Sequence, residues 1–129
     1  GLPNFLEQQL KQKTILAEKT IGILGMAFKA NNDDKRESLS YKLKKILDIE
    51  ARRVLCSDVY IKDTAFKTVD QVITQADIII IGAPHREYRD IIFPTGKIVI
   101  DMWNFYDNEG WWYETVSNRI GGVHRRVSR

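Results

Sequence analysis

Residues 20–25 read Thr-Ile-Gly-Ile-Leu-Gly, and this stretch decides the fold. It is short, nearly continuously apolar and rich in β-branched side chains, which is typical of a strand whose sheet is covered on both faces. Three further runs of the same kind follow at residues 53–57, 77–82 and 97–101. Together these runs predict a mostly parallel sheet.

Helical patterns separate the apolar runs. Leu39, Leu43, Ile46 and Leu47 form one apolar stripe, and Ser38 precedes it as an N-cap. Other helices are expected at residues 2–10, 69–76 and 87–92. The alternation of strand and helix predicts an α/β fold, Rossmann-like and doubly wound, with a mostly parallel sheet and flanking helices. Ligands of such folds bind beyond the carboxyl ends of the strands.

The composition is that of one ordinary globular domain of 129 residues with a formal charge of +3. No apolar stretch approaches the length of a membrane span, so no membrane association is expected. Cys56 is the only cysteine, which excludes an internal disulfide and fits a reducing, cytoplasmic compartment. The basic end at residues 124–129 has no aromatic residues among its charges, so we interpret it as a solvated end and expect no nucleic-acid binding.

The segment from residue 22 to residue 38 joins the first strand to its helix. Gly22 and Gly25 are three residues apart and the connection is long and polar, so it is neither a G-x-G-x-x-G dinucleotide fingerprint nor a P-loop. An NAD site in this chain is therefore disfavoured. Gly25 permits a sharp turn, and Lys29 at the carboxyl end of the strand could meet a phosphate or a carboxylate.

Further polar residues complete this segment. Asn31 and Asp33 can build Asx-type turns that hold an irregular loop in one shape. Arg36 falls at the helix start, where backbone N–H groups also favour anions. The alternative is that Asp33 and Ser38 only cap the helix and that Arg36 is solvated. Both interpretations stay open, because such helix starts are common.

Residues 25–38 read Gly-Met-Ala-Phe-Lys-Ala-Asn-Asn-Asp-Asp-Lys-Arg-Glu-Ser. This segment resembles the G-x-A-F-K-x-N-T-D-D-x-R-E-S pattern that opens the C-terminal domain of UDP-glucose/GDP-mannose dehydrogenases. Weaker similarity runs on to about Asp107, through Ser57-Asp58, through the His-Arg-Glu-Tyr segment at residues 85–88, and through residues 100–104.

The resemblance implies part of a larger enzyme that oxidises the C6 alcohol of a UDP-sugar to a uronic acid in polysaccharide biosynthesis. An N-terminal Rossmann domain of that enzyme binds NAD, a central helix pairs the subunits of a homodimer, and this C-terminal domain binds UDP. The catalytic cysteine of the family lies upstream, and Cys56 does not match it. The chain alone is therefore expected to be inactive, with no catalytic residue, no metal and no bound cofactor.

The resemblance also divides the chain and assigns its site. Residues 1–13 are similar to the end of the central helix, residues 14–107 to the UDP-binding domain, and residues 108–129 form an aromatic and basic C-terminal tail. Lys29 is expected to be the first substrate contact, and Phe28 with the backbone at Gly25 and Ala27 is expected to shape the pocket. Arg36, Asn31 and Asp33 are expected to brace the loop or to touch the substrate.

Two further residues follow predicted strands, at the carboxyl ends where ligands of such sheets bind. His85 follows a strand end and is expected either to make structural hydrogen bonds or to contact the ligand. Trp103 replaces an arginine that helps bind the anionic part of the substrate in the family, which leaves the identity of the nucleotide sugar open. The aromatic residues from 103 to 113 show no clear strand or helix period, so we expect them to cap the core or a subunit contact, or to offer a stacking surface for a base.

Other functions compete with this interpretation. A stand-alone, non-catalytic nucleotide-binding or regulatory α/β module would share the fold. A receiver domain, one example of such a module, needs carboxylates directly after the first and third strands, where this chain has Gly25-Met26 and Gly82-Ala83.

Overall fold

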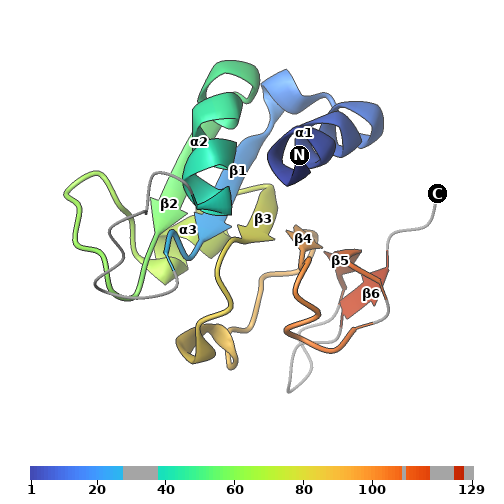
Figure 1. The fold of residues 1–129 in the computed structure, drawn as a ribbon. Helices are drawn as coiled ribbons and strands as arrows, with labels where there is room; N and C mark the ends of the chain where they lie inside the picture. Colours follow the sequence, from blue (N-terminus) through green and yellow to red (C-terminus); the bar gives the residue numbers. More distant parts are fainter. Residues whose placement is uncertain (28–37, 109, 117–123, 127–129) are drawn as a thin grey trace.

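The computed structural model describes residues 1–27, 38–108 and 110–116, and the backbone of residues 124–126. Within them lies a six-stranded sheet of order β2-β1-β3-β4-β5-β6 (Figure 1). Its four parallel strands are β1 (Thr20–Leu24), β2 (Arg53–Ser57), β3 (Ile78–Ile81) and β4 (Ile98–Ile100). The prediction of a doubly wound, mostly parallel α/β fold is confirmed.

The helices cover both faces of the sheet. Figure 1 shows α1 (Leu2–Lys13) and α2 (Leu39–Glu50) on one face and α3 (Val69–Gln75) on the other. Single 3-10 turns stand at Leu16–Glu18 (η1) and Arg86–Tyr88 (η3). The chain runs from β1 outward to β2 and then crosses back to β3, so the strand order reverses between β1 and β3. In open α/β sheets this reversal marks the ligand crevice.

Strict alternation of side chains explains why the strands read as unbroken apolar runs. In β3, Ile78 and Ile80 join the core under α1 and α2, whereas Ile79 and Ile81 join the core under α3. Both faces are covered, so neither set needs to be polar. Complete burial of one such isoleucine contributes about 1.5–3 kcal/mol relative to exposure.

Local sequence sets the helix starts. Ser38 caps α2 by accepting a hydrogen bond from the Tyr41 N–H at 3.2 Å, as predicted. Thr68 and Gln71 form a reciprocal capping box at the start of α3. At the other end of α3, the Lys97 ammonium donates to the carbonyls of Thr74 and Ala76, which would otherwise lack intrahelical partners.

Helix α1 packs on the same core as the rest of the chain. Leu6 and Leu10 are completely buried in the core that contains α2. Lys11 links the two helices through Glu50 at 3.1 Å and also contacts Glu7 at 3.4 Å.

The sequence predicts no strand after residue 101, whereas the described part of the chain has two strands there. Strand β5 (Trp112–Thr115) pairs antiparallel with β4, and β6 (His124–Arg126) pairs antiparallel with β5. Trp112 packs in the core under α1 and α2 and Tyr113 in the core under α3, so aromatic rings do in β5 what isoleucines do in β3. Such a short aromatic strand lacks the β-branched run that identified the others.

The helix expected at residues 87–92 is only one 3-10 turn, at Arg86–Tyr88. Two hydrogen bonds with the turn after β4 hold it in place. The Tyr106 hydroxyl donates to the Tyr88 carbonyl at 2.6 Å, and the Arg89 guanidinium donates to the Phe105 carbonyl at 2.7 Å.

Candidate functional site

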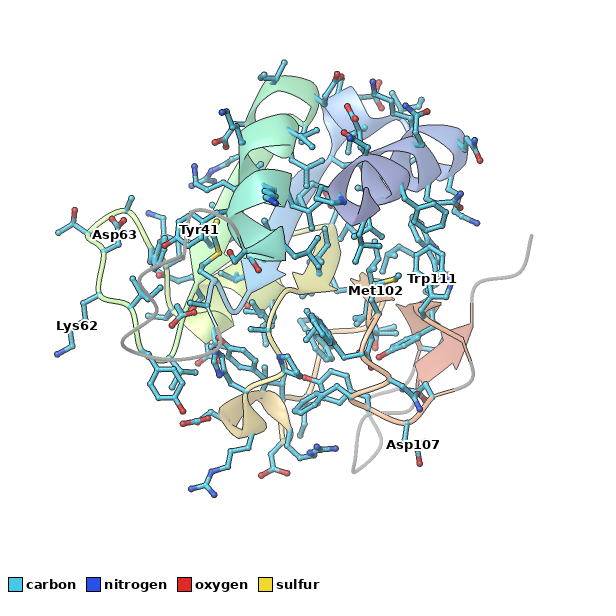
Figure 2. The ribbon with its side chains drawn as sticks, in the orientation of Figure 1. Tyr41, Lys62, Asp63, Met102, Asp107 and Trp111 are labelled. Carbon is cyan, nitrogen blue, oxygen red and sulfur yellow. The ribbon has the colours of Figure 1, made fainter. Side chains whose placement is uncertain are left out.

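The candidate site lies at the carboxyl edge of the parallel strands. Each of the four strands ends there in a turn, beginning at Gly25, Asp58, Gly82 and Asp101. Figure 2 shows the same arrangement with side chains, with Met102 in the turn after β4 and with Lys62 and Asp63 projecting from the loop after β2.

Gly25 makes the first of these turns possible. Its φ of +90° lies in the left-handed region, and a Cβ placed on it would lie 2.6 Å from the Ala83 carbonyl oxygen. The turns after β1 and β3 therefore touch through backbone atoms at the point where the strand order reverses. This contact fixes where the chain leaves β1.

Asp58 fastens the turn after β1. One carboxylate oxygen accepts from the N–H groups of Met26 at 2.5 Å and Ala27 at 3.1 Å. The other accepts from Tyr60 at 2.7 Å and Ile61 at 2.8 Å. The side chain of Asp58 is 0% exposed. A single buried carboxylate thus holds the turns after β1 and β2 together, and four backbone donors compensate its charge.

Two serines tie the start of α2 to the same turn. The Ser38 hydroxyl donates to the Met26 carbonyl at 2.9 Å, and the Ser40 hydroxyl donates to the Gly25 carbonyl at 2.6 Å. The start of α2 is therefore attached to the three-residue turn at residues 25–27 that follows β1.

The turn provides no dinucleotide cradle. The N–H groups of Met26 and Ala27, which a Rossmann loop would point at a pyrophosphate, both donate to Asp58. Gly22 serves packing, because a Cβ placed on it would lie 2.5 Å from a methyl group of Val72 in α3. The N–H groups of Met26 and Ala27 are therefore not available to a pyrophosphate.

His85 lies beside the Asp58 clamp, the set of hydrogen bonds by which the Asp58 carboxylate holds the turns after β1 and β2 together. Its side chain is 6% exposed, and its Nε2 lies 3.8 Å from the Asp58 carboxylate, beyond hydrogen-bond distance. The imidazole meets the rings of Tyr60 and Tyr88 edge-on, with ring centroids 4.9 and 5.5 Å away. Within the described residues, Nε2 makes no hydrogen bond.

A second buried carboxylate organises the turn after β4. Asp101 accepts from the N–H groups of Trp103 at 3.2 Å, Phe105 at 3.0 Å and Tyr106 at 2.9 Å. The Trp103 indole N–H donates to the Ile81 carbonyl, at the last residue of β3, at 2.8 Å. Trp103 is 39% exposed at this edge, whereas Asp101 is 2% exposed.

Residues 22–108 match the family model described as UDP-glucose/GDP-mannose dehydrogenase family, UDP binding domain. The chain belongs to this family. It is 32% identical over 125 residues to a UDP-N-acetyl-D-mannosamine dehydrogenase of Methanocaldococcus jannaschii. The alignment covers 86% of this chain and 29% of that protein. The chain thus spans less than a third of the length of this relative.

Solved structures of relatives in the family share the fold. A UDP-D-ManNAc dehydrogenase from Pyrococcus horikoshii aligns with a TM-score of 0.56 and 29% identity over 70% of this chain and 22% of that one. A UDP-glucose dehydrogenase from Pyrobaculum islandicum aligns with a TM-score of 0.58 and 25% identity over 77% of this chain and 24% of that one. These similarities agree with the UDP-binding domain assignment of the family model.

The residues predicted for the site fall into two groups. Phe28, Lys29, Asn31, Asp33 and Arg36 lie outside the described residues, so their roles stay predictions. The others lie at the carboxyl edge, as expected for Gly25, Ala27, His85 and Trp103. Gly25 and Ala27 are buried, and Ala27 is 1% exposed with its N–H engaged by Asp58, so both shape the turn from within.

Sequence reasoning missed the two carboxylates that hold this edge together. Asp58 and Asp101 stand out in the sequence only as family matches, although each is the first residue after a strand. That position was the available signal, because an acidic residue immediately after a buried strand can accept the N–H groups of the following turn.

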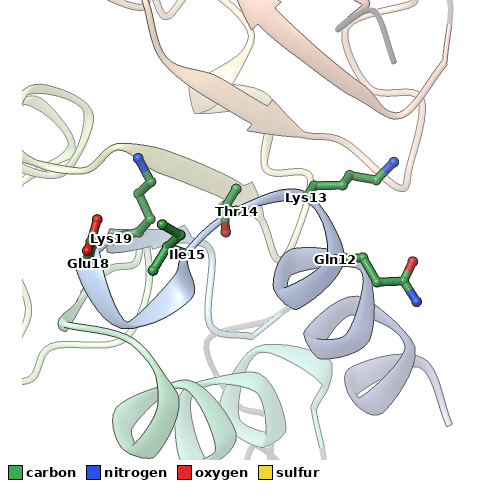
Figure 3. A pocket seen from close by; sticks show the side chains of 6 residues that line it. All are labelled: Gln12, Lys13, Thr14, Ile15, Glu18 and Lys19. Carbon is green, nitrogen blue, oxygen red and sulfur yellow. The ribbon is translucent and has the colours of Figure 1, made fainter.

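A cavity of about 400 Å³ lies at the opposite edge, where α1 ends and β1 begins (Figure 3). Gln12, Lys13, Thr14, Ile15, Glu18 and Lys19 line it. All of these residues precede β1, so the cavity is remote from the strand ends that form the candidate site.

Among the residues the structure describes, no three metal-binding side chains gather at one point. None of the helices in the described part of the chain has the length and apolar character needed to cross a membrane.

Proposed function

We propose that this chain is the UDP-sugar-binding C-terminal part of an NAD-dependent nucleotide-sugar 6-dehydrogenase. One observation carries the proposal: the Gly25–Ala27 turn is clamped by Asp58 at the strand-order reversal and leads directly into the segment that contains Lys29. The clamp engages the N–H groups of Met26 and Ala27, so we assign the contact with the diphosphate to a side chain of the segment that follows.

Lys29 is the side chain we assign to this contact. An ammonium group can meet phosphate oxygens as a compact point charge without the fixed geometry of a guanidinium. Phe28 would shape the pocket beside it, and Arg36, Asn31 and Asp33 would brace the segment. His85 has a different place in the proposal. Because its imidazole is buried between two tyrosine rings, we assign it to bracing the strand ends.

The remaining steps belong to the full-length protein. NAD would bind to a separate N-terminal domain, and a cysteine upstream of this chain would form the thioester through which the C6 alcohol is oxidised to a uronic acid. Subunits would pair as a homodimer in the cytoplasm. The domain division at residues 13/14 and 107/108 also stays a prediction.

Calorimetric titration of the chain with UDP and with NAD tests the nucleotide assignment. We expect UDP to bind and NAD to bind more weakly or not at all. A chain that binds NAD more tightly than UDP would contradict the proposal.

Substitution of Lys29 by Ala tests the contact itself. A hydrogen bond to a charged group contributes about 1.5–3 kcal/mol, so the affinity for UDP should fall roughly 10- to 150-fold while the melting temperature stays nearly unchanged. Lys19→Ala is the matched control, because it removes one lysine from the cavity at the opposite edge. Equal losses of affinity in the two variants would mean that only the overall positive charge matters.

A further inference from the structure

Trp103 differs from the core tryptophan of β5 in how it is held. Trp112 is 2% exposed and packs in the core, whereas Trp103 is 39% exposed. The polar end of Trp103 is nevertheless anchored, because its indole N–H donates to the Ile81 carbonyl at 2.8 Å. The indole therefore bridges the carboxyl ends of β3 and β4.

The backbone that carries Trp103 is fixed as well. Asp101 binds the N–H groups of residues 103, 105 and 106, and Asn104 between them adopts a left-handed φ of 54°, a conformation that asparagine takes more readily than most side-chain-bearing residues. Backbone and indole are thus both oriented before any ligand arrives. Little rotamer freedom remains to be lost on binding, which favours affinity.

An indole anchored by its N–H and partly open to solvent suits a flat ring. Tryptophan combines a large apolar face with a polar edge, and stacking on such a face tolerates different ring chemistries. The position at the carboxyl edge is where ligands of doubly wound sheets bind. A tryptophan that only sealed the core would be expected to bury its ring, as Trp112 does.

We propose that Trp103 is a specificity-determining residue that stacks on a ring of the ligand bound at the β3–β4 edge. The shared chemistry is a flat, weakly polar ring face, which the uracil base or the C–H face of a hexose can supply. This inference rests on the proposed function, because it assigns one part of the UDP-sugar to one residue.

Two substitutions separate the ring face from the anchor. Trp103→Leu removes the aromatic ring and the bond to Ile81, whereas Trp103→Phe keeps a ring but also loses that bond. Phe5→Leu is the control for loss of an exposed ring elsewhere. Phe5 is 45% exposed on α1, and the centroid of its ring lies 6.0 Å from that of Trp111. Each variant is titrated with UDP and with UDP-glucose, and its melting temperature is recorded.

We expect Trp103→Leu to weaken binding about tenfold, with Trp103→Phe within about threefold of the unaltered chain and Phe5→Leu unchanged. Equal weakening toward both ligands places the uracil on the indole, and weakening toward UDP-glucose alone places the sugar there. If Trp103→Phe loses as much affinity as Trp103→Leu, the anchor matters and the stacking proposal is wrong. Unchanged affinity in both Trp103 variants also overturns it.

Fluorescence gives a second measurement that a purely structural role would not affect. Stacking should quench indole emission on addition of UDP-glucose, and also on addition of UDP if the uracil is the stacked ring. Trp103→Phe should abolish this quenching while Trp111 and Trp112 still emit. Quenching that persists in Trp103→Phe overturns the inference. If the unaltered chain binds neither ligand, the proposed function fails and this inference fails with it. Binding with no effect of Trp103 substitution refutes this inference alone.

Discussion

Replacement of Asp58 by Asn is the sharpest test of how the candidate site is held. The substitution preserves shape and volume but exchanges one acceptor oxygen for an NH₂ group. Each oxygen of Asp58 accepts two backbone N–H groups, at Met26 and Ala27 on one side and at Tyr60 and Ile61 on the other. Whichever way the new amide is oriented, two backbone donors lose their acceptor and face another donor: either the partly buried pair at Met26 and Ala27, or the pair at Tyr60 and Ile61, of which Tyr60 is exposed.

The magnitude follows from the number of bonds and from their burial. A hydrogen bond to a charged group contributes about 1.5–3 kcal/mol, and a buried donor left without a partner costs a similar amount. Because the two lost bonds share one oxygen, their contributions are not additive, and we expect a loss of about 3–4 kcal/mol. Domains of this kind have total stabilities of about 5–15 kcal/mol, so such a loss is a large share of the total.

Urea unfolding followed by circular dichroism measures this loss. Asp63→Asn is the matched control, because Asp63 lies in the same loop as Asp58 (Figure 2) and its side chain accepts one N–H among the residues described, from Ala65 at 2.8 Å at an exposed position. We expect the control to change stability by less than about 0.5 kcal/mol. A loss below about 1 kcal/mol in Asp58→Asn, or equal losses in the two variants, would refute the clamp.

Two further predictions follow from the buried groups near the sheet. Burial raises the pKa of the Cys56 thiol from 9.0 to about 12, so a thiol reagent at pH 8 should label the folded chain only as fast as it unfolds. The pKa of the thiol is higher in the folded chain than in the unfolded chain, so its contribution to stability is complete below pH 9 and is lost as the pH rises toward 12. The difference in free energy of unfolding between the unaltered chain and Cys56→Ala, measured in urea, should therefore shrink between pH 8 and pH 10. His85→Phe keeps the contacts with Tyr60 and Tyr88 and removes a buried nitrogen that makes no hydrogen bond within the described residues, so its free energy of unfolding should equal that of the unaltered chain or exceed it by about 1 kcal/mol. A loss above about 1 kcal/mol would instead reveal a partner for Nε2.

The parallel part of the fold could be predicted because its information is local. Each apolar run needs only its own residues to be recognised, and the cap at Ser38 needs only the three that follow it. β5 could not be predicted in the same way. Trp112 and Tyr113 are ordinary surface-capping candidates until β4 lies beside them, because only their inclusion in a strand of the sheet sends one ring to each face.

The site shows the same division between local and distant information. Gly25 could be predicted as a sharp turn from its type and place, and its φ of +90° agrees with this. The partners that give the turn its shape come from elsewhere, with Asp58 bonded across 31 and 32 residues and Ser40 across 15. Trp103 likewise reaches Ile81 across 22 residues. Sequence patterns report the strand to which a turn belongs, but they do not report which polar groups converge on it.

The two buried carboxylates also bear on which ligand this edge can accept. An anion approaching an unpaired aspartate would be repelled, yet Asp58 receives four N–H groups and Asp101 receives three, so both charges are directed into backbone dipoles and away from solvent. The same bonds remove those N–H groups from the set that could bind a phosphate. A Rossmann loop keeps its backbone donors for the ligand, whereas this edge uses them for its own rigidity. Because the described turns engage these N–H groups internally, side chains are the contacts to test, and we expect single substitutions such as Lys29→Ala and Trp103→Leu to change the affinity for an anionic nucleotide.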